Sequence, residues 1–303
     1  MLRATVVLAG LALVASCGSR AGEPAAAAPS TLAPTRPPAR PPANAPAPAP
    51  SGAASAPLRV ERLRIAVLAS HPHDAGSYTQ GLLWHAGSLY ESSGLYGQSS
   101  LREVEPATGK VIRRADDPGN VFGEGLALAG DRLVQLSWRE GVASVYALAT
   151  FEKVAEHRYA GEGWGLSYDG SRLIQSDGTD VLTFRDPRTF AETGRLAVRR
   201  EGQPVFQLNE LECVGGAIYA NVYQTDEIVR IDGKTGAVTA SIDASGLLTN
   251  EEKAAGAEVL NGIAWNPETR RFYVTGKLWP KLFEVRFVPP ETTASHPQRR
   301  AIR

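Results

Sequence analysis

The sequence contains little of the chemistry that disulfides and metal centres need, with two cysteines and five histidines among 303 residues. Cys17 lies in the N-terminal segment, so Cys213 has no partner for an intrachain disulfide, and we expect it to be a small buried hydrophobe. The histidines show no spacing typical of a metal site, and we interpret the nearest candidate, His71-Pro72-His73-Asp74, as an exposed loop. Phosphate-binding glycine loops, Ser-His-Asp sets and cysteine clusters are also missing. We therefore predict no cofactor and no catalytic metal, and leave a structural calcium at a loop open.

The sequence also lacks an excess of charge and a long apolar run. Its 32 basic and 32 acidic residues interleave, and without a basic stripe we expect no nucleic-acid partner. The apolar run from Ala4 to Ala15 is shorter than the roughly 20 residues of a membrane span. Because it follows Arg3 and leads into small residues, we predict a secretory signal peptide over residues 1–16.

A cysteine directly follows this segment, in Val14-Ala15-Ser16-Cys17. The pattern resembles a bacterial lipobox, in which the cysteine is lipidated and becomes the mature N-terminus; the alternative is a plain signal peptide. Residues 17–57 are rich in Ala and Pro, which predicts an extended tether without a core. We therefore expect an exported protein of the cell envelope that faces the periplasm and meets the membrane only through a lipid anchor on Cys17. Which membrane carries the anchor stays open.

A repeat organises the remaining chain, which we divide into a folded domain over residues 58–289 and a disordered tail over 290–303. Five segments open alike and recur every 40 to 52 residues: Thr79-Gln80-Gly81-Leu82, Gly123-Glu124-Gly125-Leu126, Gly163-Trp164-Gly165-Leu166, Leu208-Asn209-Glu210-Leu211 and Leu260-Asn261-Gly262-Ile263. Such a period is typical of the four-stranded blade of a β-propeller. Within each unit, short alternating strands are separated by turn residues.

These patterns predict an all-β fold, a five-bladed β-propeller. The last unit has room for only three strands, so we expect the segment over residues 62–68 to supply the fourth and to close the ring by pairing the two ends of the domain. One short helix is expected over residues 247–256, capped by Thr249, as an insertion before the last blade. A β-sandwich is the rival architecture, but it does not account for the shared openings.

The first strand of each propeller blade lines the central channel, so the shared openings are expected to meet at one mouth. That placement gathers polar and aromatic side chains in a concavity, the usual form of a small-ligand site. They are Gln80, Glu124, Trp164, Asn209 and Asn261.

At these positions the sequence resembles the plant and bacterial glutamine cyclotransferase family. The resemblance rests on seven motifs in order: Tyr78-Thr79-Gln80-Gly81-Leu82, Tyr90-Glu91-Ser92-Ser93-Gly94-Leu95-Tyr96-Gly97, Phe122-Gly123-Glu124-Gly125-Leu126, Gly163-Trp164-Gly165-Leu166, Leu208-Asn209-Glu210-Leu211-Glu212, Leu260-Asn261-Gly262-Ile263-Ala264 and Val274-Thr275-Gly276-Lys277-Leu278-Trp279. It implies a five-bladed propeller that needs no metal and closes the N-terminal glutamine of peptides or proteins into 5-oxoproline with release of ammonia.

The resemblance also implies roles for single residues. Glu124 matches the central acid and Phe122 an aromatic beside it. The remaining matches to the pocket are Gln80, Trp138, Trp164, Asn209 and Lys277. Tyr78 stands where phenylalanine is common, and Tyr223 stands where the family often has tryptophan, which leaves the peptide preference at that wall open.

The chemistry suggests how these groups act. We expect Glu124 to take a proton from the attacking α-amino nitrogen and give it to the leaving ammonia. Lys277 and Gln80 are suited to polarise the amide oxygen, and Asn209 to hold the α-amino group. Each has a structural alternative, such as a solvated lysine or a turn asparagine, and Asp177 is open between a turn and the channel.

Two rival functions remain open at this stage. A non-catalytic envelope scaffold predicts a channel that binds no glutaminyl peptide. A metal-dependent propeller lactonase needs several channel carboxylates and asparagines around a cation, which the tryptophans and Lys277 fit poorly. Because the sequence shows no large apolar surface run, we expect a monomer.

Overall fold

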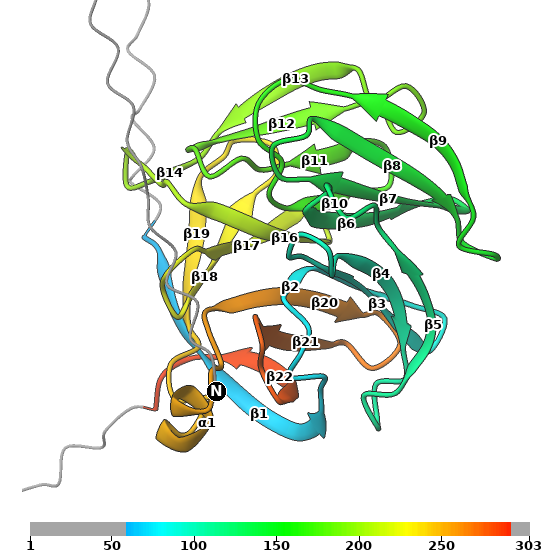
Figure 1. Ribbon diagram of the computed structural model, residues 1–303. Coiled ribbons are helices and arrows are strands. Elements are labelled where there is room, and N and C mark those ends of the chain that lie inside the picture. Colours follow the sequence, from blue (N-terminus) through cyan, green and yellow to red (C-terminus); the bar gives the residue numbers. More distant parts are fainter. Residues whose placement is uncertain (1–58, 292–303) are drawn as a thin grey trace, which may run out of the picture. The chain divides into compact units, whose positions relative to one another are not determined.

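The computed structural model of this protein describes residues 59–291. They contain 22 β-strands and one short helix (Figure 1), so the predicted all-β fold class is confirmed. The predicted signal peptide over residues 1–16, the tether over 17–57 with Cys17, and nearly all of the predicted tail over 290–303 lie outside the described residues. Within the described range, no helix has the length and apolar character needed to cross a membrane.

Three antiparallel sheets each contain four consecutive strands. The first contains β2 (Thr79–His85), β3 (Ser88–Ser93), β4 (Ser100–Val104) and β5 (Val111–Asp116). The second contains β6 (Gly123–Ala129), β7 (Arg132–Ser137), β8 (Val142–Ala147) and β9 (Lys153–Arg158). The third contains β10 (Leu166–Tyr168), β11 (Leu173–Gln175), β12 (Val181–Arg185) and β13 (Glu192–Ala197). Two-residue turns join β2 to β3 and β6 to β7, and longer loops join the other strands. Between β2 and β3, Ala86 and Gly87 both have positive φ, as a type I′ hairpin turn requires.

A fourth sheet contains eight strands because the N-terminal strand β1 (Glu61–Pro72) pairs on both sides. Its remaining strands are β16 (Leu208–Val214), β17 (Ala217–Val222), β18 (Glu227–Asp232), β19 (Val238–Asp243), β20 (Leu260–Asn266), β21 (Arg271–Gly276) and β22 (Lys281–Val288). β1 runs parallel to β19 near its start and antiparallel to β22 along most of its length. The predicted pairing of the two ends of the domain is therefore present, and no strand edge is left open between them.

The predicted helix is shorter than the expected segment over residues 247–256. The helix α1 spans Asn250–Ala254 and is capped by Thr249, whose hydroxyl accepts from the backbone N–H of Glu252. The Glu252 carboxylate accepts from the backbone N–H of Thr249 in return, which completes a capping box. A small hairpin, β14 (Arg199–Arg200) with β15 (Gln203–Pro204), was not predicted.

The first strands of the repeated units lie side by side in the order β2, β6, β10, β16, β20, and β20 lies beside β2 again. Glycines allow this close approach. A Cβ atom on Gly125 of β6 would collide with the backbone of Gly165 and Leu166, and one on Gly165 would collide with the backbone of Asn209. The glycines shared by the openings are therefore required by packing between neighbouring first strands.

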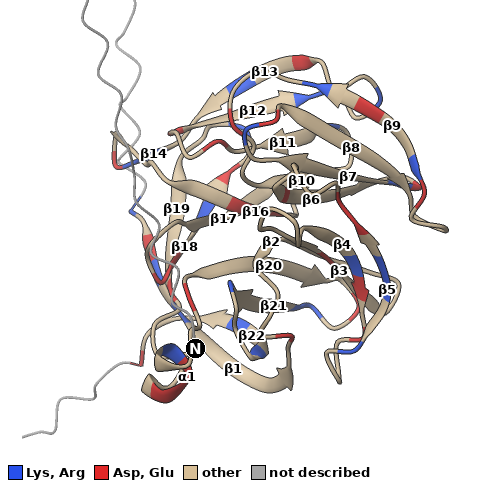
Figure 2. Ribbon diagram, viewed as in Figure 1, with Lys and Arg blue, Asp and Glu red and all other residues tan. Residues whose placement is uncertain are grey.

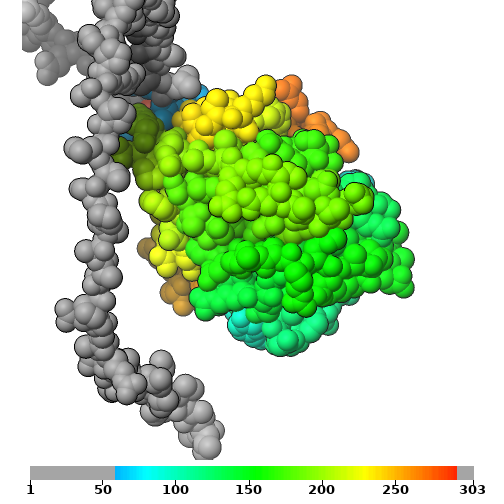
Figure 3. Space-filling view, turned by 90° about the horizontal axis from the view of Figure 1, so that it is seen from above, coloured from blue at the N-terminus to red at the C-terminus, as the bar shows by residue number. Residues whose placement is uncertain are grey.

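The apolar core lies between successive sheets. Leu101, Leu126 and Leu133 pack between the first and second sheets, and Val134 and Leu166 between the second and third. All five are 1% exposed or less, and each contributes about 1.5–3 kcal/mol by burial. Figure 3 shows the second and third sheets (green) packed directly against one another along one side of the folded unit.

Charged side chains of both signs are interspersed on the outer strands. Strand β9 carries Lys153, Glu156 and Arg158, and β13 carries Glu192 and Arg195 (Figure 2). Pairs such as Arg195 with Glu192 are exposed on the surface, where each contributes little to stability. This distribution matches the interleaving of charges along the sequence.

Candidate functional site

The same local irregularity aims one side chain of several first strands towards a common space. In β2, β6, β16 and β20, the pairing with the second strand shifts register around Gln80, Glu124, Asn209 and Asn261. A β-bulge of this kind leaves the extra residue outside the ladder and redirects its side chain. Four of the five shared openings therefore encode a bulge as well as a strand, whereas in the third opening Trp164 lies just before β10, which pairs without a shift.

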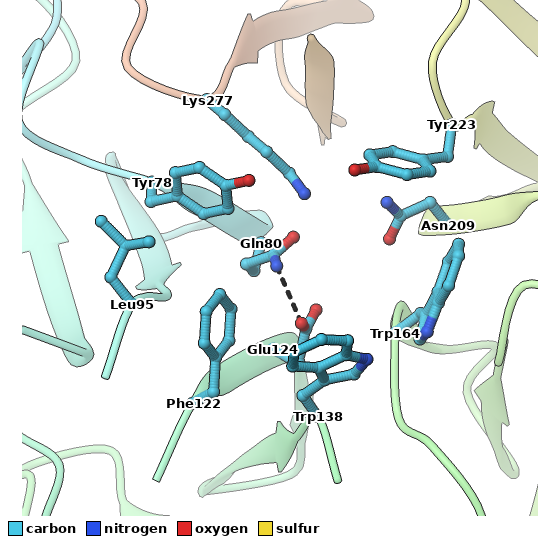
Figure 4. Close-up of a pocket in the computed structure, with 10 residues that line it drawn as sticks. All are labelled: Tyr78, Gln80, Leu95, Phe122, Glu124, Trp138, Trp164, Asn209, Tyr223 and Lys277. Atoms are coloured by element: carbon cyan, nitrogen blue, oxygen red, sulfur yellow. Dashed lines mark hydrogen bonds between the residues drawn. The ribbon is translucent and has the colours of Figure 1, made fainter. Parts of the chain in front are cut away.

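These side chains meet in a pocket of about 230 Å³. Figure 4 shows its lining: Tyr78, Gln80, Leu95, Phe122, Glu124, Trp138, Trp164, Asn209, Tyr223 and Lys277. Nine of the ten side chains that we expected to meet here are among them. The tenth, Asn261, is fully buried outside the lining and hydrogen-bonds Gln80 instead. The lining residues come from the first strands, from the residues just before those strands, and from the segments that follow the second strands.

Glu124 is the carboxyl group of the pocket and is 4% exposed. Burial raises its pKa well above the ordinary value, and the negative charges of Glu162 and Glu140 add to this, whereas the charge of Lys277 opposes it. The Gln80 amide donates to Glu124 Oε1 at 2.8 Å, and the Asn261 amide donates to Gln80 Oε1 at 3.2 Å. The Gln80 amide thus fixes the orientation of Glu124, and Asn261 fixes the orientation of Gln80.

Lys277 faces Glu124 from the segment after β21 and is 3% exposed. Burial lowers the pKa of Lys277, and the charges of Glu124 and Glu258 oppose that effect. Its Nζ lies 4.7 Å from the ring centre of Tyr78 and 4.9 Å from that of Tyr223. Two aromatic faces therefore stabilise the ammonium group where water does not.

Asn209 has an unused acceptor in this pocket. Its Oδ1 is buried and has no hydrogen-bond partner among residues 59–291, although most buried side-chain oxygens have one. Figure 4 shows its amide directed into the space between Lys277, Tyr223 and Trp164. This oxygen is available to a donor on a bound ligand.

Aromatic rings form the walls on both sides of Glu124. Phe122 packs edge-on against Trp138, with ring centres 5.6 Å apart, and also against Tyr78 at 6.1 Å. On the other side, Trp164 and Tyr223 pack edge-on at 5.5 Å. These walls create the low-dielectric surroundings in which the charges of the pocket interact strongly.

Three residues near the site were not predicted. Leu95 lies directly after β3, and the repeat itself would have revealed it, because Trp138, Tyr223 and Lys277 follow the second strands of their own units. Glu162 accepts hydrogen bonds from two pocket tryptophans, and Glu258 acts on Tyr78. For Glu162 and Glu258 the sequence carries no signal, because they act on partners brought close only by the fold.

The hydroxyl of Tyr78 links the pocket to the segment that carries α1. Burial raises the pKa of Tyr78, and the charge and hydrogen bond of Glu258 raise it further. A phenylalanine at this position would lack that bond. The tyrosine therefore adds a polar contact to the wall that faces Lys277.

The interpretation of His71-Pro72-His73-Asp74 as an exposed loop is wrong for its first three residues, because His71 and Pro72 end strand β1 and His73 is buried. The His73 side chain is 5% exposed, and its ring nitrogens lie 3.1 Å from Glu91 Oε1 and 2.7 Å from the carbonyl oxygen of Trp279. Burial alone would lower the pKa of His73, but Glu91 and the Trp279 carbonyl raise it overall. This pair joins β3 to the segment that carries Lys277.

Other candidates from the sequence have structural surroundings. Asp177 accepts from the backbone N–H and the hydroxyl of Thr179, which resolves it as a turn residue. Cys213 is half-buried against the core, and burial raises its pKa to about 12. Within the described part of the chain, no three His, Cys, Asp or Glu side chains gather as a metal site would require.

The site thus places one buried carboxyl group with a raised pKa opposite a buried lysine, inside a small aromatic-walled pocket with an unused acceptor. This arrangement is typical of the active site of an enzyme that acts on a small polar substrate. Comparison with known proteins specifies which. The sequence pattern described as glutamine cyclotransferase matches residues 43–287, and the chain belongs to this family.

Two relatives agree with that membership. The glutaminyl-peptide cyclotransferase of Arabidopsis thaliana is 43% identical over 228 residues, which cover 73% of this chain and 71% of the relative. The crystal structure of Myxococcus xanthus glutaminyl cyclase is 40% identical, with a TM-score of 0.70, and the match covers 77% of this chain and all of that one. The family and enzyme class predicted from the seven motifs are confirmed.

Proposed function

We propose that this pocket closes the N-terminal glutamine of peptides into 5-oxoproline, and that Glu124 carries a proton from the attacking to the leaving nitrogen. The single observation that carries the proposal is the buried Glu124 carboxyl group, with its raised pKa, opposite Lys277. A general acid–base works best when its pKa lies near the working pH. Burial moves the pKa of Glu124 in that direction.

The proton balance needs one carboxylate. The neutral α-amino nitrogen attacks the side-chain amide carbon, a C–N bond forms, and the carbonyl oxygen becomes negative. Glu124 takes a proton from the attacking nitrogen and delivers it to the amide nitrogen of the side chain. The old C–N bond then breaks, ammonia leaves, and the five-membered lactam remains. Glu124 ends as the carboxylate that began the cycle.

Lys277 and Asn209 supply the remaining contacts in this proposal. The ammonium of Lys277 stabilises the oxygen as it becomes negative, and Gln80, whose amide donates to Glu124, holds that carboxyl group in place. Asn209 Oδ1, which has no partner among residues 59–291, accepts from the α-amino group and holds it for attack. A group held in attack geometry avoids much of the entropy cost of the reaction.

Replacement of Lys277 by methionine tests the first of these roles. Lys277→Met keeps a long apolar side chain between Tyr78 and Tyr223 but removes the charge, so kcat falls by about 10²- to 10³-fold. The variant also loses the charge that lowers the pKa of Glu124, so the acid limb of the pH–rate profile moves to higher pH. Steady-state ammonia release across pH measures both. An unchanged limb and a loss below tenfold would contradict the role.

A coupled ammonia assay tests the function itself. Gln-initiated dipeptides incubated with the soluble part from about residue 58 release ammonia at a rate that a chelator leaves unchanged. Background release would favour the scaffold, and sensitivity to the chelator would favour a metal-dependent enzyme. The proposal of a metal-independent reaction is supported by the lining of the pocket, because Lys277 and aromatic rings fit a cation poorly.

We also propose that the sheets form a five-bladed propeller. The ring of first strands β2, β6, β10, β16 and β20 supports this, as does an apolar core between each sheet and the next. In this arrangement β1 joins two blades of the eight-stranded sheet. A crystal structure in which these eight strands form one continuous barrel wall would contradict the count of five.

Export and a lipid anchor on Cys17 complete the proposal, together with a monomeric state. The motif Val14-Ala15-Ser16-Cys17 carries this step. Expressed in a Gram-negative host, the native chain partitions into the detergent phase of the envelope fraction, and Cys17→Ala releases it to the soluble periplasm. A native chain that is soluble before the substitution would contradict the anchor, and light scattering on the released form tests the monomer.

A further inference from the structure

Glu162 joins the two tryptophan walls of the pocket. Its Oε2 accepts from the indole Nε1 of Trp138 at 2.8 Å and from that of Trp164 at 3.0 Å. Its other oxygen, Oε1, accepts from Arg139 Nε at 3.0 Å. One carboxylate therefore holds three donors from three positions in the chain.

The arrangement around Glu162 is reinforced by the backbone and by stacking. The guanidinium of Arg139 lies 3.7 Å from the ring centre of Trp138, so one side chain pairs with Glu162 and covers the ring that Glu162 holds. The backbone N–H of Gly163 donates to the carbonyl of Trp138 at 2.9 Å. The two tryptophans are therefore connected through both main chain and side chain.

Glu162 retains its charge in this environment. Burial alone would raise its pKa, but the hydrogen bonds from both tryptophans and the contacts of Arg139 lower it overall. A charged acceptor bonds an N–H roughly twice as strongly as a neutral one. Glu162 is also half-exposed at the rim, which keeps the cost of burying its charge small.

The consequence concerns what the pocket offers to a substrate. An indole N–H without a partner would compete for the amide oxygen of a bound glutamine. With both N–H groups bound by Glu162, the rings present their faces to the pocket, and Figure 4 shows both indole nitrogens on the side away from Lys277. The substrate amide is then left to Gln80, Lys277 and Asn209.

We propose that Glu162 is a positioning residue that sets substrate affinity by fixing the faces of Trp138 and Trp164. This inference rests on the proposed function, because it names the substrate that the faces receive. Glu162 touches no reacting atom in this scheme. Its loss therefore affects KM more than kcat.

Two substitutions separate the role of Glu162 as a hydrogen-bond acceptor from the role of its charge. Glu162→Gln and Glu162→Leu both remove the charge, but only glutamine keeps an oxygen that accepts from both indoles. We expect Glu162→Leu to raise KM for a Gln-initiated dipeptide by about tenfold or more, with kcat changed less. Glu162→Gln is expected to raise KM by less than about threefold. Equal KM changes in the two variants, or none in Glu162→Leu, would overturn the inference.

The charge gives a second readout and a matched control. The groups that act on the charge of Glu124 are Lys277, Glu162 and Glu140, so removal of either glutamate lowers the pKa of Glu124 and moves the acid limb to lower pH. Glu140 bonds the hydroxyl of Tyr96 and neither indole. Glu140→Gln is therefore expected to shift the limb without the KM change of Glu162→Leu.

The near-ultraviolet signal of the two tryptophans tests their positioning without any measurement of activity. It therefore separates failure of this inference from failure of the proposed function. Near-ultraviolet circular dichroism of the full chain is expected to change in Glu162→Leu and to stay native-like in Glu162→Gln, with far-ultraviolet spectra unchanged in both. If the native protein releases no ammonia, the proposed function fails, while this spectral contrast still tests the positioning. Identical near-ultraviolet spectra in all three proteins would overturn it.

Discussion

Glu124→Gln is expected to lower kcat for Gln-initiated peptides by about 10²- to 10⁴-fold, the usual contribution of a positioned acid–base group. The amide keeps an oxygen for the donor Gln80 but can neither take nor deliver a proton at working pH. Ammonia release under saturating peptide measures the effect. Glu140→Gln is the matched control, because it removes a nearby carboxylate outside the pocket lining and should keep turnover within about tenfold.

The stability of this variant separates chemistry from unfolding. The pKa of Glu124 is raised in the folded state, so the folded state binds more protons than the unfolded chain, and the wild type loses stability as pH rises through the interval between the two pKa values. An amide avoids that loss. Glu124→Gln is expected to unfold at the same temperature as the native protein or higher at neutral pH. A folded variant that keeps turnover within tenfold of native would end the shuttle hypothesis.

The pH–rate profile of the native protein is expected to reflect the shifted pKa values of Glu124 and Lys277. The reaction needs Glu124 ionised and Lys277 charged, as well as a neutral α-amino group on the substrate, whose own titration is measured on the free peptide. Because the pKa of Glu124 is raised and that of Lys277 is lowered, the acid limb lies above the usual carboxylate range and the alkaline limb below the usual lysine range. The pH–rate profile is therefore a bell-shaped curve that is narrower than the ordinary pKa values of a glutamate and a lysine predict.

Glu91→Gln is expected to cost about 3–5 kcal/mol of the free energy of unfolding, as for a buried ion pair that loses one partner. Glu91 is 2% exposed and accepts from Ser77, Thr79 and His73. Burial would raise its pKa, but His73, Arg102 and the hydrogen bonds lower it to about 2. The substitution leaves His73 buried without its counter-charge, and urea unfolding near pH 6 measures the loss.

The pH dependence of this loss has a definite sign. The stability from Glu91 is complete above the ordinary carboxyl pKa of 4.5 and is lost as pH falls towards 2. The stability from His73, whose pKa is raised, is complete below 6.5 and is lost as pH rises through the folded value. The difference between native and variant is therefore largest between about pH 4.5 and 6.5. A difference below 1 kcal/mol there, no larger than that of Glu103→Gln at the half-exposed pair with Arg113, would contradict the account.

The sequence was informative wherever a local pattern carried the fold. The repeated openings predicted which first-strand residues meet, because a strand and its bulge depend on nearby residues. The terminal pairing followed from a unit that lacked its fourth strand. The helix near Thr249 followed from its cap, although it is shorter than expected.

Most of the misses at the site depend on contacts between residues far apart in the sequence. Glu162 and Glu258 act on partners that the chain brings close only after folding. His73 was expected to be exposed because Pro72 and Asp74 flank it, but its side chain is buried. Its burial depends on Glu91 and on the carbonyl of Trp279, neither of which is near it in sequence. The hairpin of β14 and β15 was missed because Gly202 and Pro204 are typical of a plain loop.

A crystal structure of Glu124→Gln with a bound Gln-initiated dipeptide tests the central claim most directly. We expect the side chain at position 124 to lie within about 2.6–3.2 Å of both the α-amino nitrogen and the side-chain nitrogen of the glutamine, with the amide oxygen towards Lys277. A peptide bound outside this pocket, or one whose two nitrogens lie out of reach of position 124, would contradict it.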